Sequence, residues 1–117
     1  MDFDVTTERL GDAQAVISPV GELDLYTAPE LKQELLEAIE GGVTQIVVDL
    51  TRTTFIDSAT LGVLVGAVRR LRERDGKLSI VCSDRSIRKI FEITGLDRVL
   101  AIYAGRDEAL GAVGSAV

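Results

Sequence analysis

Apolar residues recur along this chain with two different periods, which predict strands that alternate with helices. Short runs rich in β-branched residues predict strands, the clearest of them over residues 45–50. Gly11 and Asp12 separate the first two runs and are typical of a hairpin turn. The predicted strands cover residues 3–8, 13–19, 45–50, 78–82 and 99–103.

The helical period begins after the second strand. Leucine and isoleucine recur every four residues over residues 29–40, which predicts an amphipathic helix. Thr27 is a good N-cap residue for it, Pro29 suits its first turn, and Gly41 ends it.

A second helix is predicted to begin at Ser58, as its N-cap, and to end before Asp75 and Gly76. Its apolar stripe consists of Leu61, Leu64, Val65, Val68 and Leu71. A third helical face is opened by Ser83 or Asp84 and closed by Gly95; a shorter helix over residues 107–113 ends the pattern. The third face is formed by Ile87, Ile90, Phe91 and Thr94.

The element order is therefore β-β-α-β-α-β-α-β-α. Strands that alternate with helices pair in parallel, and the opening hairpin adds an antiparallel pair. We expect one α/β domain over residues 1–117, with a mixed sheet of four to five strands. About four helices are expected to pack mainly on one face of that sheet.

Composition narrows the functional classes. The chain has 117 residues and a net charge of −6, which argues against direct binding to nucleic acid or to an anionic membrane surface. It contains no histidine and a single cysteine, Cys82, which argues against a metal site and a Ser-His-Asp triad. The apolar surroundings of Cys82 predict a buried, unreactive thiol. Nothing in the sequence suggests a signal peptide or a membrane span, so a cytoplasmic protein is expected.

Ser58 is the candidate that organises the functional interpretation. A helix start offers free backbone N–H groups and the positive end of the helix dipole, so a phosphate on this serine would be well held. Ala59, Gly62 and Gly66 are small, which would let a partner approach the helix closely. A simple capping role is expected as well and does not compete with phosphorylation.

Several acidic residues are weaker candidates. Asp57 is expected to assist the cap rather than to act as a catalytic base, since no nucleophile or second acid accompanies it. Asp49 follows a buried strand, and the sequence leaves its role open. Glu22 and Asp24 are interpreted as part of a solvated acidic turn. The basic run from Arg69 is interpreted as a solvated helix face.

Four motifs occur in order along the chain. They are Gly21-Glu22-Leu23-Asp24, Ala28-Pro29, Asp57-Ser58-x-x-Leu61-Gly62 and Phe91-Glu92-Ile93-Thr94-Gly95-Leu96. Taken together, these motifs resemble the STAS domain group, the bacterial anti-sigma factor antagonists. The resemblance covers essentially the whole chain, and it implies a mixed sheet with helices.

The resemblance implies a regulator rather than an enzyme. The unphosphorylated protein would bind an anti-sigma factor that is also a serine kinase and so release the sigma factor. Phosphorylation of Ser58 would switch binding off, and a PP2C-type phosphatase would restore it. The protein would need no cofactor and would be a monomer when free. The partner-binding residues would be Glu22, Asp24, Thr27, Asp57, Ser58, Ala59, Thr60 and Leu61.

One departure from the family pattern concerns the middle of the serine motif. The family usually has Ser or Thr followed by Gly, where this chain has Ala59 and Thr60. This difference bears on the choice of partner, and Thr60 becomes a second possible phosphate acceptor. Two alternative functions stay open: a STAS-type scaffold or regulatory subunit of a stress-signalling complex or transporter, and a small-ligand binder or enzyme. The scaffold predicts a basic or hydrophobic docking patch, which the sequence does not reveal.

Overall fold

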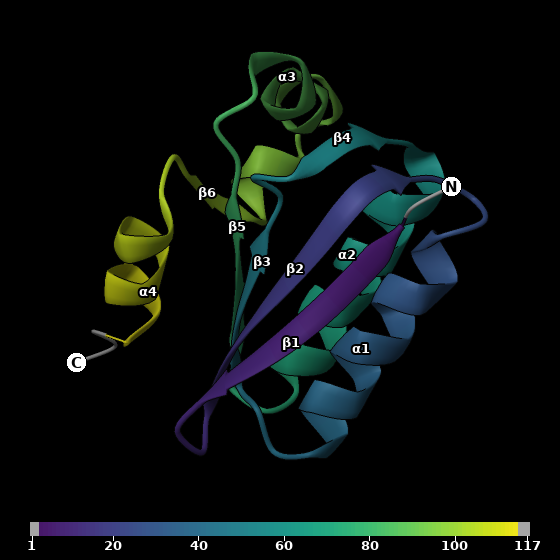
Figure 1. Ribbon diagram of the computed structural model, residues 1–117. Helices are drawn as coiled ribbons and strands as arrows, with labels where there is room; N and C mark the ends of the chain where they lie inside the picture. Colours follow the sequence, from purple (N-terminus) through teal and green to yellow (C-terminus); the bar gives the residue numbers. More distant parts are fainter. Residues whose placement is uncertain (1–2, 115–117) are drawn as a thin grey trace.

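A mixed β-sheet with helices on both faces forms the framework of the protein (Figure 1). The computed structural model describes residues 3–114. Its elements, in chain order, are β1 (Asp4–Leu10), β2 (Gln14–Leu23), α1 (Ala28–Glu40), β3 (Gln45–Asp49), β4 (Thr53–Ile56), α2 (Ser58–Arg72), β5 (Lys77–Val81), α3 (Arg85–Thr94), the 3-10 helix η1 (Leu96–Arg98), β6 (Ala101–Tyr103) and α4 (Arg106–Gly114).

The sheet has the strand order β1-β2-β3-β5-β6, and β4 pairs with the far end of β2. Only the β1–β2 hairpin is antiparallel among these pairs; all the others are parallel. The predicted turn at Gly11 is confirmed, since its φ of 77° favours glycine. The sheet has six strands, one more than the upper end of the expected range.

Alternating side chains of the central strands separate two apolar layers. On one face, Ile46 and Val48 belong to the main core, which they form together with the buried sides of α1, α2 and α3. On the other face, Val47 packs with Ala109 of α4 in a smaller cluster. Because side chains of a strand alternate between its two faces, one continuous apolar run serves both layers.

Helix placement agrees with the expected fold class. Helices α1 and α2 lie side by side on one face, and α3 packs near β4 at the end of the sheet (Figure 1). The helices thus pack mainly on one face, as expected, and α4 is the exception that lies on the opposite face (Figure 1). The sequence of α4 is weakly amphipathic, so its docking side was not evident from the pattern.

Two strand boundaries also differ from the prediction. Strand β4 was not predicted because it has only four residues, and Thr54 and Phe55 in its middle are exposed. Strand β2 extends to Leu23, so Gly21 and Glu22 are strand residues rather than part of an acidic turn. Both differences have one cause, because the end of β2 pairs with β4 in parallel and each strand stabilises the other.

Candidate functional site

The candidate site lies where β2 and β4 end side by side. Leu23 of β2 is the register partner of Ile56 of β4, with one residue between Ile56 and the start of α2. The loop of residues 24–27 therefore lies next to the N-terminus of α2. The pairing brings together two motifs that are more than thirty residues apart in the sequence.

Asp57, not Ser58, is the N-cap residue of α2. Its backbone is extended, and its Oδ1 accepts a hydrogen bond of 3.2 Å from the backbone N–H of Thr60. The preferred capping role of Asp57 is thus confirmed, and the prediction that Ser58 is the N-cap is wrong by one residue. The carboxylate is the better acceptor for the helix N–H groups, which leaves Ser58 as the first helical residue.

Thr60 fastens the start of α2 to the sheet. Its side chain is 0% exposed, and its hydroxyl donates a hydrogen bond of 3.0 Å to the carbonyl oxygen of Leu23. A buried hydrogen bond of this kind fixes the position of α2 relative to the end of β2. The predicted partner contact of Thr60 is therefore not one that its buried side chain offers in this structure, and the burial also argues against Thr60 as a second phosphate acceptor.

The loop between β2 and α1 is organised by its own hydrogen bonds. Oδ1 of Asp24 accepts from the backbone N–H groups of Tyr26 and Thr27, at 2.9 and 3.0 Å. The hydroxyl of Thr27 donates to the carbonyl oxygen of Glu22 at 2.7 Å and accepts from the N–H of Asp24. Thr27 stands at the N-cap position of α1, as predicted, but its hydroxyl bonds the loop and makes no cap hydrogen bond. Asp24 and Thr27 therefore make this loop rigid.

Ser58 has the accessibility that a modified residue needs. Its side chain is exposed, and no hydrogen-bond partner for its hydroxyl exists within residues 3–114. Across the same part of the chain, the backbone N–H groups of Ser58 and Ala59 also find no acceptor. The first turn of α2 thus offers free donors beside an exposed hydroxyl.

Two apolar residues of the site were missed by the sequence analysis. Leu25 is 66% exposed and Tyr26 is 85% exposed, both in the loop before α1. A pocket of about 420 Å³ lies beneath this loop; it is lined by Phe3, Gly21, Glu22, Asp24, Tyr26, Thr27 and Thr54. An apolar pair inside an otherwise polar turn was the available signal. Exposed apolar side chains of this kind are typical of protein interfaces.

The eight predicted site residues gather in one region, with different accessibility. Glu22 and Ser58 are exposed, and Asp24, Thr27, Asp57 and Ala59 are partly exposed. Leu61 is 9% exposed and belongs to the main core, so it offers almost no surface to a partner. Six of the eight residues are thus accessible at the end of the sheet.

Outside the site, Asp49 joins α4 to the sheet. Its Oδ2 accepts hydrogen bonds from Nε and Nη2 of Arg106, at 3.1 and 2.9 Å, and its Oδ1 accepts from the N–H of Thr51. Burial raises the pKa of Asp49, but the hydrogen bonds from Thr51 and Arg106 outweigh it and hold this pKa below its ordinary value. The open role of Asp49 is thus structural.

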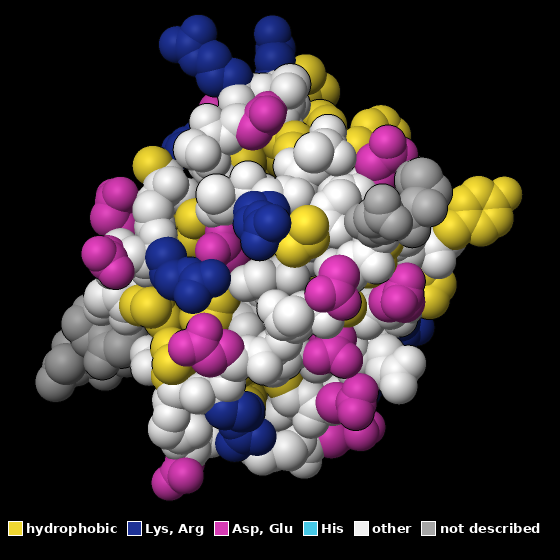
Figure 2. All heavy atoms as spheres, viewed as in Figure 1, with side chains coloured by type: hydrophobic (Ala, Val, Ile, Leu, Met, Phe, Trp, Pro, Cys, Tyr) yellow, Lys and Arg dark blue, Asp and Glu magenta, His cyan; other side chains and the backbone are white. Residues whose placement is uncertain are grey.

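Cys82 is buried, as predicted, and burial raises the pKa of its thiol. Within residues 3–114, no group of three or more acidic or cysteine side chains is placed to hold a metal ion. In the same residues, no helix combines the length and apolar character needed to cross a membrane. On the face seen in Figure 2, basic side chains are interspersed with acidic and neutral ones, and no continuous basic surface forms.

Comparison with known proteins identifies the relatives of this chain. The model of the family described as "STAS domain" matches residues 4–109. An anti-sigma-B factor antagonist of Listeria monocytogenes is 46% identical over 85 residues, which cover 70% of this chain and 72% of the relative.

Solved structures lead to the same group. An anti-sigma factor antagonist from Mycobacterium paratuberculosis has a TM-score of 0.89 and 28% identity, and the match covers 97% of this chain and 96% of that one. The Bacillus cell fate determinant SpoIIAA in its phosphorylated form has a TM-score of 0.74 and 27% identity, with 94% and 99% covered.

Proposed function

Because the chain belongs to the STAS domain family, we propose that it acts as an anti-sigma factor antagonist, the function for which its relatives are named. Its partner is a serine-kinase anti-sigma factor, and its unphosphorylated form binds this partner and releases the sigma factor. Phosphorylation of Ser58 switches binding off. The chain acts as a cytoplasmic binding protein and a kinase substrate rather than as an enzyme.

The observation that supports this proposal most directly is the accessibility of the Ser58 hydroxyl. Its hydroxyl is exposed and unbonded within the described chain, on a helix start fixed by Asp57 and Thr60. A kinase needs an accessible hydroxyl as its substrate. A phosphate switch also needs a rigid binding surface, one that does not rearrange when the charge of the phosphate is added. The solved phosphorylated form of the Bacillus relative supports the same chemistry.

The switch follows from charge. A phosphate adds about −1.5 to −2 charges at neutral pH. The free N–H groups of Ser58 and Ala59 and the dipole of α2 hold such a charge without refolding the helix. In a complex, the same dianion lies in a desolvated interface beside the carboxylate of Asp57. Direct disruption of the interface is therefore the mechanism.

The partner surface consists of the accessible residues around Ser58. Glu22, Asp24 and Asp57 give it negative charge, while Leu25 and Tyr26 supply apolar contacts. Both apolar residues lie in the loop next to the start of α2, so they support a partner that recognises Ser58 more than a separate scaffold surface. A PP2C-type phosphatase completes the cycle by restoring the hydroxyl.

The test is the intact mass of this protein after incubation with ATP and each kinase-type anti-sigma factor of the same genome. We expect one of them to add a single phosphoryl group to the protein and to Ser86→Ala, but not to Ser58→Ala. Ser86 is the matched control because it is an exposed serine in the first turn of α3. Phosphorylation that persists in Ser58→Ala, or none with any of these kinases, would contradict the proposal.

A further inference from the structure

A groove runs between α1 and α2, beginning beside the candidate site. Ala59, next to Ser58, lines one end and Arg70 lines the other, and the volume is about 360 Å³. Arg70 lies eleven positions after Ala59, so the groove follows α2 for about 16 Å, or three helical turns. This length suits a short helical segment of a protein better than a compact small molecule.

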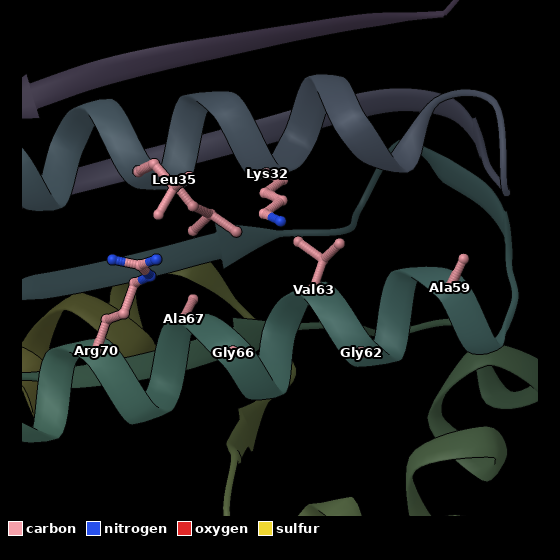
Figure 3. A pocket seen from close by; sticks show the side chains of 9 residues that line it. Lys32, Leu35, Ala59, Gly62, Val63, Gly66, Ala67 and Arg70 are labelled. Carbon is pink, nitrogen blue, oxygen red and sulfur yellow. The ribbon is translucent and has the colours of Figure 1, made fainter.

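Two glycines make the groove, and the fold does not require either of them. Gly62 and Gly66 lie on the side of α2 that faces the groove (Figure 3). A Cβ atom at either position would meet no heavy atom within 4 Å, and neither residue has a positive φ. Glycine weakens a helix interior relative to alanine. Contacts within the described chain give no reason for these two glycines, whereas an external helix would need the space.

The walls of the groove are apolar, and its cations lack partners. Leu35 and Leu36 of α1 and Val63 and Ala67 of α2 supply the apolar lining. Lys32 points from α1 towards Val63, and Arg70 points from α2 towards α1 near Leu35 (Figure 3). Neither forms an ion pair within residues 3–114. In a chain of net charge −6, a groove lined by two cations and by no acidic residue favours an acidic partner.

We propose that the α1–α2 groove receives an acidic amphipathic helix of the anti-sigma factor, as a second anchor beside Ser58. This inference rests on the proposed function and deepens it. The apolar face of the helix packs against Val63 and over the two glycines, as helices do where small residues let them approach closely. Lys32 lies across the groove from Val63, and Val63 precedes Arg70 by seven residues, which is about two helical turns. Acidic residues about two turns apart on the partner helix would therefore pair with both cations.

With this second anchor, Ser58 can control the interface even though the residues around it supply only part of the binding free energy. The groove opens beside Ala59, so a helix seated in it places the rest of the partner over Ser58. Phosphate then disrupts the part of the interface that surrounds Ser58, while the groove itself is unchanged.

The experiment measures the affinity of the anti-sigma factor for the protein and two matched glycine variants. Gly66→Leu fills the groove, and we expect it to lower the affinity at least about tenfold without lowering the melting temperature. Gly111→Leu is the control, because Gly111 is also a helical glycine with open space, but on α4 at the other face of the sheet. It should change the affinity less than about twofold.

Charge reversal provides an independent arm. Arg70→Glu should lower the affinity at least about threefold, whereas Arg69→Glu, which is exposed on α2 but does not line the groove, should not. Unchanged affinity in Gly66→Leu and Arg70→Glu would overturn the groove proposal while the function proposed for Ser58 stands. A dimer of this chain that Gly66→Leu dissociates would assign the groove to a second copy and overturn it too. If no anti-sigma factor binds the unmodified protein, both proposals fail.

Discussion

Helices α2 and α3 begin with the same chemistry, yet only α2 presents a free hydroxyl. Each has an aspartate N-cap: Oδ1 of Asp57 accepts the backbone N–H of Thr60, and Oδ1 of Asp84 accepts two backbone N–H groups of the first turn of α3. In α3 the hydroxyl of Ser86 donates to Oδ1 of Asp84 at 2.6 Å, so it is used by the cap. In α2 the hydroxyl of Ser58 is unbonded within the described chain.

The two helix starts also differ in how they are attached. Thr60 ties α2 to the end of β2 through a buried hydrogen bond to Leu23. At the start of α3, Arg85 and Ser86 are exposed, and the hydroxyl of Ser86 bonds the cap residue Asp84 rather than the sheet. Many helices have a capping residue and a serine in their first turn. The candidate site differs because its serine hydroxyl is unbonded and its helix is attached to the sheet.

The largest effect is expected from a negative charge at each serine. Ser58→Asp should weaken binding of the anti-sigma factor by about a hundredfold, because it puts an unpaired charge into the interface. Ser86→Asp adds the same charge at the start of α3 and should leave the affinity within about twofold. Titration calorimetry measures both. Equal losses of affinity in the two variants would contradict the difference between the two helix starts, since the effect would then follow net charge rather than position.

A smaller effect is expected when the tie between α2 and the sheet is removed. Thr60→Val keeps the shape of the side chain but leaves the buried carbonyl of Leu23 without its donor, and should lower the free energy of unfolding by about 1–3 kcal/mol. Thr94→Val is the control because the exposed Thr94 hydroxyl bonds only to its own helix. It should cost less than about 0.5 kcal/mol in a urea titration. The reverse order would contradict the role of Thr60.

Removal of the N-cap side chain of α2 should lower the free energy of unfolding by an amount typical of N-cap residues. Asp57→Ala takes the acceptor from the N–H of Thr60 and should lower the free energy of unfolding by about 1 kcal/mol. Asp57→Asn keeps an acceptor and should recover most of this loss. Urea titrations of the three proteins provide the measurement. An Asn variant as unstable as the Ala variant would show that the carboxylate charge, rather than the cap bond, matters.

The smallest effect concerns pH and the start of α3. Hydrogen bonds from the hydroxyl of Ser86 and the N–H groups of Ile87 and Ser86 hold the pKa of Asp84 below its ordinary value of 3.8. A lowered pKa in the folded state means stability that is present above 3.8 and is lost as the pH falls through the folded pKa. Ser86→Ala should raise the pKa of Asp84 in an NMR titration. An unchanged pKa would show that the Ser86 hydroxyl does not serve the cap.

Regular patterns made most of the fold predictable from the sequence. The spacing of Leu31, Leu35 and Ile39 identified α1, and the run from Ile46 to Val48 identified the central strand β3. Strand β4 was missed because it is stabilised by its partner β2 rather than by a pattern of its own. The docking side of α4 was missed because it depends on Asp49 and Arg106, which are 57 residues apart.

The candidate site was predicted in part, for reasons of the same kind. Local signals placed Ser58 and Asp57 at the start of a helix, and only their order in the cap was wrong. Which residues are exposed is decided by tertiary packing, so the burial of Thr60 and the exposure of Tyr26 could not be read from the sequence. The family motif identifies which positions belong to the site. Only the fold shows which of these residues are exposed on the surface and which are buried beneath it.

Phosphate on Ser58 should decide whether this protein binds its anti-sigma factor. The most direct measurement is the dissociation constant of one preparation before and after it is phosphorylated at Ser58 by its kinase. We expect the phosphorylated protein to bind at least about a hundredfold more weakly, and phosphatase treatment to restore the original affinity. Equal dissociation constants for the two forms would contradict it.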